Sequence, residues 1–116
     1  MNIDEVLEGL VQFGEDDWLP LWVIAQDVEE LLDIEDPNQN LEVTITLVKE
    51  LLKRGFRAGE PPLTSAVHFV AWPDQDPESV TSLIRREWIY RGTLPGWGTG
   101  PWFCAPDRGR AGQCLS

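Results

Sequence analysis

The sequence contains little of what most enzymes and membrane proteins need. It has one histidine, two cysteines and one tyrosine in 116 residues, and it has no apolar run of the about 18 residues that a membrane helix requires. The N-terminus, MNIDEVLEGL, is acidic where a secretory signal is basic. Cys104 and Cys114 lack the paired spacing of a metal or disulfide framework. These absences predict a cytoplasmic protein with no metal, no cofactor and no membrane association.

Basic residues are missing from the first 48 positions. Lys49 is the first of nine Lys and Arg residues, whereas residues 1–48 hold thirteen of the twenty carboxylates. The remaining 68 residues hold seven acids and nine bases, a net +2 within an overall net charge of -11. Self-repulsion of this kind costs stability, and a partner of opposite charge is one reason to keep it. Solubility explains a net negative charge but does not explain why the carboxylates are concentrated in the first 48 residues. The charge distribution therefore favours a basic binding partner.

Apolar periodicity predicts one α+β domain over residues 1–106, with a helical N-terminal half and a flexible tail over residues 107–116. Three helices come first, a small antiparallel sheet follows, and a fourth helix lies between its strands. The apolar stripes of the helices cover residues 3–11, 18–32, 41–52 and 80–88. The strands are expected at residues 56–58, 66–72 and 101–105.

Glycine, proline and aspartate set the expected ends of these elements. Gly14 is expected to end the first helix, and Asp16 or Asp17 to cap the second. The segment 33–40, DIEDPNQN, reads as a polar loop. Gly55 and Gly92 are expected to close the third and fourth helices.

The segment GWGTGPWFC, residues 96–104, has the glycine spacing of a phosphate-binding loop. A phosphate loop must open a helix, whereas Gly100 is followed by a proline and a strand-like run with no Gly-Lys-Ser/Thr ending. The glycines are therefore predicted to form a hinge that lets residues 102–104 add a strand to the sheet. Trp97 is either a lid over the core or an exposed anchor for a partner.

The order of three helices and a hairpin over residues 1–72 resembles a winged-helix domain, with ELLKRGFRAGE, residues 50–60, at the junction of the third helix and the wing. This resemblance implies an alternative function as a nucleic-acid-binding transcriptional regulator. Its phosphate contacts would come from Lys49, Lys53, Arg54 and Arg57. Four cations are a modest footprint, and the carboxylates of the first two helices would have to face away from DNA. Nucleic acid is therefore not the expected partner.

Candidate catalytic residues are few. His68 lies within the apolar run AVHFV, and Cys104 is flanked by Phe103 and Ala105. A base or a nucleophile needs an orienting partner, and the sequence indicates none for this pair. Segment 33–40 is rich in oxygen ligands but lacks the central glycine and the terminal glutamate of an EF-hand loop. We therefore predict that the protein is not an enzyme. An enzyme that uses His68 and Cys104 remains an alternative, ranked after a binding protein and a nucleic-acid-binding regulator.

The candidate partner-binding residues gather on the second helix and the loop after it. Trp22 falls on the flank of this helix with Glu29 and Asp33, off the apolar stripe. A partly exposed tryptophan beside carboxylates is typical of a binding hot spot. The alternative is that the fourth helix or the C-terminal segment covers Trp22, and the sequence favours neither interpretation. The predicted site is Trp22, Asp27, Glu29, Glu30, Asp33, Glu35, Asp36 and Trp97.

A small, acidic, single-domain chain without catalytic groups resembles bacterial immunity proteins. These neutralise a toxin by covering its active site or an exosite. The resemblance implies a non-enzymatic inhibitor whose acidic helices dock on a basic partner such as a nuclease toxin, with carboxylates where phosphates would lie. Phage-encoded inhibitors that mimic nucleic acid, of the anti-restriction and anti-CRISPR kinds, share these traits and compete with the immunity interpretation.

Overall fold

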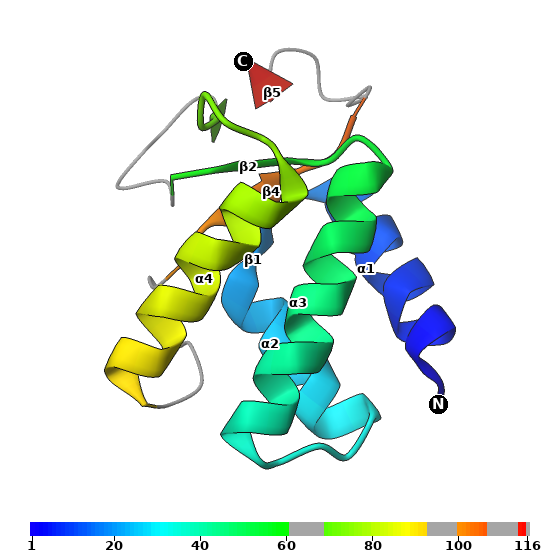
Figure 1. Cartoon of the computed structure of the whole chain (residues 1–116). Coiled ribbons are helices and arrows are strands. Elements are labelled where there is room, and N and C mark those ends of the chain that lie inside the picture. The colour runs from blue at the N-terminus through cyan, green and yellow to red at the C-terminus, as the bar shows by residue number, and fades with distance from the viewer. Residues whose placement is uncertain (61–68, 93–99, 107–113, 116) are drawn as a thin grey trace.

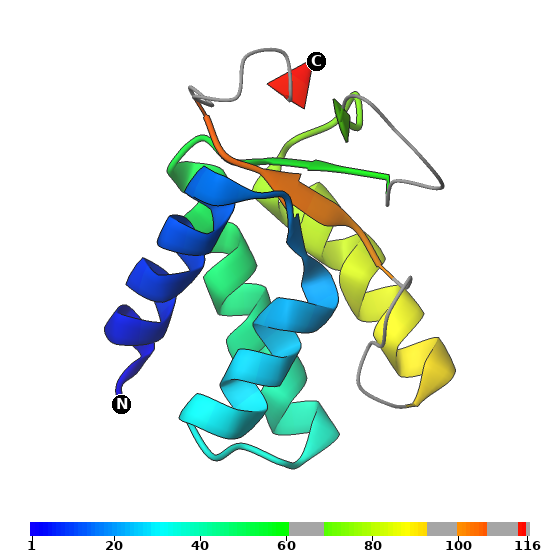
Figure 2. The ribbon, with the colours of Figure 1, turned by 180° about the vertical axis from the view of Figure 1, so that it is seen from behind.

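Four helices and a three-stranded antiparallel sheet make up the α+β fold in the described part of the chain, as the sequence predicts (Figure 1). A computed structural model describes residues 1–60, 69–92, 100–106 and 114–115. The helices are α1 (Ile3–Asp16), α2 (Leu21–Leu31), α3 (Pro37–Lys53) and α4 (Pro77–Arg91). The strands are β1 (Leu19–Pro20), β2 (Arg57–Gly59), β3 (Phe69–Val70), β4 (Trp102–Cys104) and β5 (Cys114–Leu115). Both views place the sheet across one end of the helices (Figure 2).

The three-stranded sheet has β4 at its centre, between β1 and β2. Phe103 of β4 faces Leu19 on one side and Ala58 on the other, and it is fully buried. On the outer side of β2, the backbone N–H of Trp72 donates to the carbonyl of Ala58 at 2.9 Å. The predicted place of residues 101–105 beside the first hairpin strand is thus confirmed. The second predicted hairpin strand, residues 66–72, is not part of this sheet: it meets β2 through an isolated antiparallel bridge between Gly59 and Ala71, and residues 61–68 lie outside the described residues.

The strand β1 corrects the predicted start of the second helix. Leu19 and Pro20 were expected within that helix, but they pair with β4 instead. Pro20 has the extended backbone of an N-cap, and the N–H of Leu21 donates to the carbonyl of Pro101 at 3.1 Å. Because the helix begins only at Leu21, Trp18 precedes it rather than extending its apolar stripe.

Gly14 does not end α1, which continues to Asp16. A β-carbon at Gly14 would lie 2.5 Å from Cε2 of Phe56. The glycine therefore allows the Phe56 ring to approach the helix closely and has no role in ending it. Gly55 and Gly92, with φ angles of 98° and 74°, adopt the left-handed conformation that was predicted for helix ends.

The third helix begins four residues earlier than predicted, at Pro37. Asp36 caps it by accepting the N–H of Gln39 at 3.0 Å. Asn40 is fully buried, although the polar residues around it in the sequence predicted an exposed loop. Its side-chain amide is satisfied within the core, so the polar segment can be helical at little cost.

A single hydrophobic core joins all four helices to the sheet. The side chains of Trp88 and Phe56 are buried in it, whereas Trp72 lies at its edge and is half-buried. In the described residues, no helix is long and apolar enough to cross a membrane. Of the predicted tail, Cys114–Leu115 form β5, which pairs in parallel with β3, and residues 107–113 and 116 lie outside the described residues.

Candidate protein-binding surface

The cations of the described residues pair with only a few of the carboxylates. The ion pairs are Lys49–Glu78 (2.9 Å), Lys53–Glu50 (3.4 Å), Arg54–Glu8 (3.1 Å), Arg91–Glu87 (3.9 Å) and Arg85–Glu42. Among these carboxylates, Glu8 and Glu42 are the two that come from the first 48 residues. The other eleven acids of that region form no ion pair with any described residue. The asymmetry seen in the sequence therefore survives folding.

Four of these unpaired acids lie at one end of the molecule. Asp27, Glu29 and Glu30 occupy the C-terminal half of α2, and Asp33 follows two residues after the helix ends. We call these four residues the α2 acidic end. Figure 2 shows the end of α2 and the loop that leads into α3 on the side of the molecule opposite the sheet. The end of α2 that holds these acids therefore lies away from the sheet.

The position of the α2 acidic end is electrostatically unfavourable. The C-terminus of a helix carries partial negative charge, and α2 contains no Lys or Arg to offset it. Burial raises the pKa of Asp27, and the neighbouring Glu30 carboxylate raises it further. Asp33 has a left-handed backbone with φ of 57°, a conformation that aspartate adopts more readily than most residues with a side chain. The absence of a cation at the end of α2 and the half-buried Asp27 beside Glu30 therefore reduce stability.

The two remaining predicted acids have different surroundings. Asp36 is exposed, and its carboxylate is the N-cap of α3. Glu35 is exposed beside it, near the positive end of the α3 dipole. Both acids therefore interact favourably with the start of α3, so a binding partner is not needed to explain them.

The two predicted tryptophan anchors differ in what the structure says of them. Trp22 is half-buried, and its indole Nε1 is buried with no hydrogen-bond partner among the described residues. The sequence left a partly exposed anchor and a covered residue as alternatives, and the ring in the structure is partly exposed. Trp97 lies outside the described residues.

Asn40 positions the acidic end, and the sequence interpretation missed it. Its Nδ2 donates to the carbonyl of Ala25 at 3.1 Å and to that of Ile34 at 3.4 Å, while its Oδ1 accepts the hydroxyl of Thr44 at 2.9 Å. These bonds attach both α2 and the following loop to α3. The signal was present in the sequence, because Asp36 and Pro37 repeat the cap and first-turn proline that correctly predicted α4.

The structure describes only part of the groups considered for catalysis or metal binding. Cys104 is fully buried in the central strand, with Sγ 3.7 Å from the carbonyl oxygen of Ala105. His68 lies outside the described residues. Among residues 1–60, 69–92, 100–106 and 114–115, no three His, Cys, Asp or Glu side chains gather in a way that would hold a metal ion.

The cations of the nucleic-acid alternative are largely occupied. Lys49, Lys53 and Arg54 each pair with a carboxylate of this chain, and the Arg57 side chain is half-buried with its Nε enclosed. DNA phosphates would have to displace three of these partners. The predicted phosphate footprint is therefore weaker than the residue types alone suggest.

No family model, curated protein or solved structure matches this chain. Its function has to be inferred from the charges, burial and contacts of its own residues.

Proposed function

We propose that this protein is a non-enzymatic inhibitor that binds and neutralises a basic protein, such as a nuclease toxin, in the manner of bacterial immunity proteins. The observation that carries the proposal is the α2 acidic end, whose four carboxylates have no ion-pair partner in the described structure. Five of the seven described Lys and Arg residues pair with other carboxylates. A basic partner would provide the missing counter-charge.

The cost of the α2 acidic end supports a role in binding. A Lys or Arg near the end of α2 would add about 0.3–1 kcal/mol of stability through the helix dipole. The chain instead has Glu29 and Glu30 there, with Asp27 half-buried beside them. Residues that serve binding often reduce stability, because they are selected for the complex and not for the free protein.

The proposed mechanism of inhibition requires no chemistry. Carboxylates at the end of α2 attract a cationic groove over long range and raise the association rate. In the complex they would occupy positions where substrate phosphates bind. Trp22 lies earlier on α2, and its partly exposed ring offers apolar contact beside the charges.

The proposal is tested by capture on the immobilised protein followed by an activity assay. The wild-type chain should retain a basic protein from the source organism and should inhibit the activity of that protein when the two are mixed in equal amounts. A variant with Asp27, Glu30 and Asp33 each replaced by lysine should retain and inhibit it much less. Retention without inhibition, or equal retention by the variant, would contradict the proposal.

The identity of the captured protein separates the competing interpretations. A toxin supports an immunity function, whereas a restriction or CRISPR enzyme supports the phage-inhibitor interpretation. The regulator alternative is tested by gel shift at low salt. Retardation of duplex DNA that is lost on replacing Lys53 and Arg54 with alanine would support it over inhibition.

A further inference from the structure

A cleft lies at the opposite end of α3 from the α2 acidic end. It opens to solvent between the segment after β3 and the first turns of α4, with a volume of about 350 Å³. Helix α3 has 17 residues, so about 25 Å separates its two ends. The residues that line the cleft are Glu60, Trp72, Pro73, Asp74, Ser79, Val80 and Leu83.

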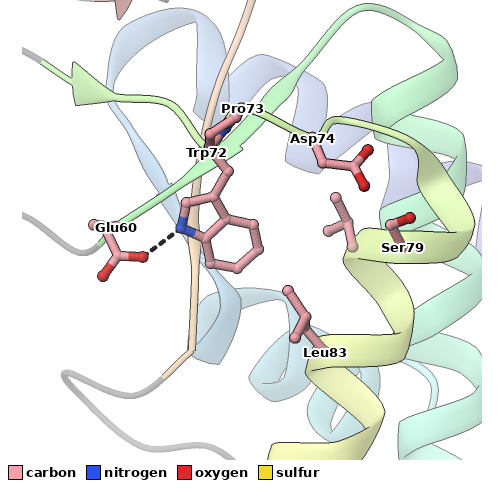
Figure 3. A pocket seen from close by; sticks show the side chains of 7 residues that line it. Glu60, Trp72, Pro73, Asp74, Ser79 and Leu83 are labelled. Carbon is pink, nitrogen blue, oxygen red and sulfur yellow. Dashed lines mark hydrogen bonds between the residues drawn. The ribbon is translucent and has the colours of Figure 1, made fainter.

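The walls of the cleft differ in character. The Trp72 ring forms one side, and Leu83 of α4 faces it from the other (Figure 3). Val80 of α4 also lines the cleft. Asp74 lies at the rim above them, and the indole N–H of Trp72 points away from α4 and donates to the Glu60 carboxylate. The walls are therefore apolar and aromatic.

The charge at the cleft is of one sign. Glu60 and Asp74 are both exposed, and none of the seven lining residues is basic. Asp74 accepts the N–H of Asp76 through Oδ1 at 2.9 Å, which fixes the carboxylate at the rim and leaves Oδ2 for another donor. An apolar cleft with two carboxylates at its rim matches a ligand that has an apolar stem and a cationic head.

We propose that this cleft accepts an arginine side chain of the basic partner. Its methylene stem would pack against Trp72 and Leu83, and its guanidinium would meet Asp74. Arginine fits better than lysine because its planar guanidinium can lie beside the aromatic wall while its fixed N–H groups donate to Oδ2 of Asp74. The identity of the donor rests on the proposed function, but the chemistry of the cleft can be tested on this chain alone.

Arg86 limits the direction from which the arginine enters. It lines an adjoining hollow with Glu78, Ser79, Ser82 and Leu83, and it forms no ion pair within the described residues. Its charge repels a second cation, so the arginine should enter from the side of Glu60 and Asp74. Replacing Arg86 with glutamine should therefore tighten binding about twofold to fivefold.

The experiment is an NMR titration that follows the indole N–H resonance of Trp72, assigned with a Trp72→Phe variant. The probe is N-acetyl-arginine amide, and the matched neutral probe is N-acetyl-citrulline amide. The arginine probe should give a saturable shift in the millimolar range, and the citrulline probe should give none at the same concentrations. Asp74→Asn should weaken binding about fivefold, as expected for one partly exposed charge pair.

The control variants separate loss of charge from loss of structure. Asparagine at position 74 keeps an oxygen for the Asp76 N–H, so the loop should remain folded. Glu35→Gln removes an acid at the far end of α3 and should leave the titration unchanged. Equal shifts with the two probes, or unchanged binding by Asp74→Asn, would overturn the proposal and show a cleft that takes neutral apolar groups. Neither result bears on the capture experiment with the α2 acidic end.

Discussion

Replacing Asn40 with alanine tests whether the buried amide holds α2 and its acidic end against α3. The side chain is fully buried and forms two hydrogen bonds of good length, to the carbonyl of Ala25 and from the hydroxyl of Thr44. A third, to the carbonyl of Ile34, is longer at 3.4 Å. No water can replace these partners without entering the core. Alanine therefore removes the bonds and leaves a small cavity.

The expected loss of stability follows from these contacts. Each of the two good hydrogen bonds contributes about 1 kcal/mol net, and the orphaned polar atoms and the cavity add a further 1–2 kcal/mol, roughly. The free energy of unfolding should therefore fall by about 3–4 kcal/mol. With a urea m-value of about 2 kcal/mol per molar, the unfolding midpoint should fall by about 1.5–2 M.

Urea unfolding followed by circular dichroism measures this loss. Gln39→Ala is the matched control, because Gln39 is exposed and its backbone N–H still bonds to Asp36; the change should stay within about 0.5 kcal/mol. Thr44→Val should cost less in the Asn40→Ala background than alone, since the partner of the hydroxyl is already missing. A loss below about 1 kcal/mol for Asn40→Ala, or fully additive effects, would refute this role of the amide.

Four further substitutions probe local features of the fold by urea unfolding. Burial raises the folded pKa of Asp27 above its unfolded value, so its contribution to stability falls as pH rises through that interval. Asp27→Asn should therefore raise the unfolding midpoint at pH 7, with a gain that shrinks as pH falls through the raised pKa and is lost below the unfolded value of about 4. The hydrogen bond from Arg85 lowers the folded pKa of Glu42, so Glu42→Gln should lower the midpoint at pH 7, and the difference should fade as acid protonates the wild-type carboxylate. A pH-independent difference would contradict either assignment. Gly14→Ala should destabilise by about 1–3 kcal/mol because its β-carbon meets Phe56, whereas Gly9→Ala, with open space around it, should stabilise by about 0.5–1 kcal/mol; equal effects would show that Phe56 moves aside freely.

Local signals in the sequence predicted much of the fold. Asp76 and Pro77 correctly marked the start of α4, and the glycines at positions 55 and 92 marked helix ends. The strand after Gly100 was also predicted, together with its place beside the first hairpin strand. These elements depend on caps, turns and periodicity, which act over a few residues.

Long-range contacts account for the elements that the sequence did not predict. Leu19 and Pro20 form a strand because β4 lies beside them, and β4 is about 80 residues away in the chain. Gly14 fits within α1 because of Phe56, and Asn40 fits within α3 because of Ala25 and Thr44. Periodicity within a short window contains no information on such partners.

The sequence predicted the charge of the candidate site but did not predict which side chains surround each acid. The sequence showed that the acids are concentrated before Lys49, and it grouped Asp27, Glu29, Glu30 and Asp33. It did not show that Asp36 caps a helix or that Lys49 and Arg54 pair with carboxylates outside the α2 acidic end. Those distinctions depend on which side chains meet in three dimensions.

The rate of association with the captured partner tests the central claim most directly. Replacing Asp27, Glu30 and Asp33 with lysine adds two charge units at each position and moves the net charge from -11 to -5. The same charge change placed on α1, at Asp4, Glu15 and Asp16, is the matched control. The account predicts that the α2 variant associates at least about tenfold more slowly at low salt, and that the α1 variant slows much less. Equal slowing by both variants, or unchanged rates, would contradict a binding site at the α2 acidic end.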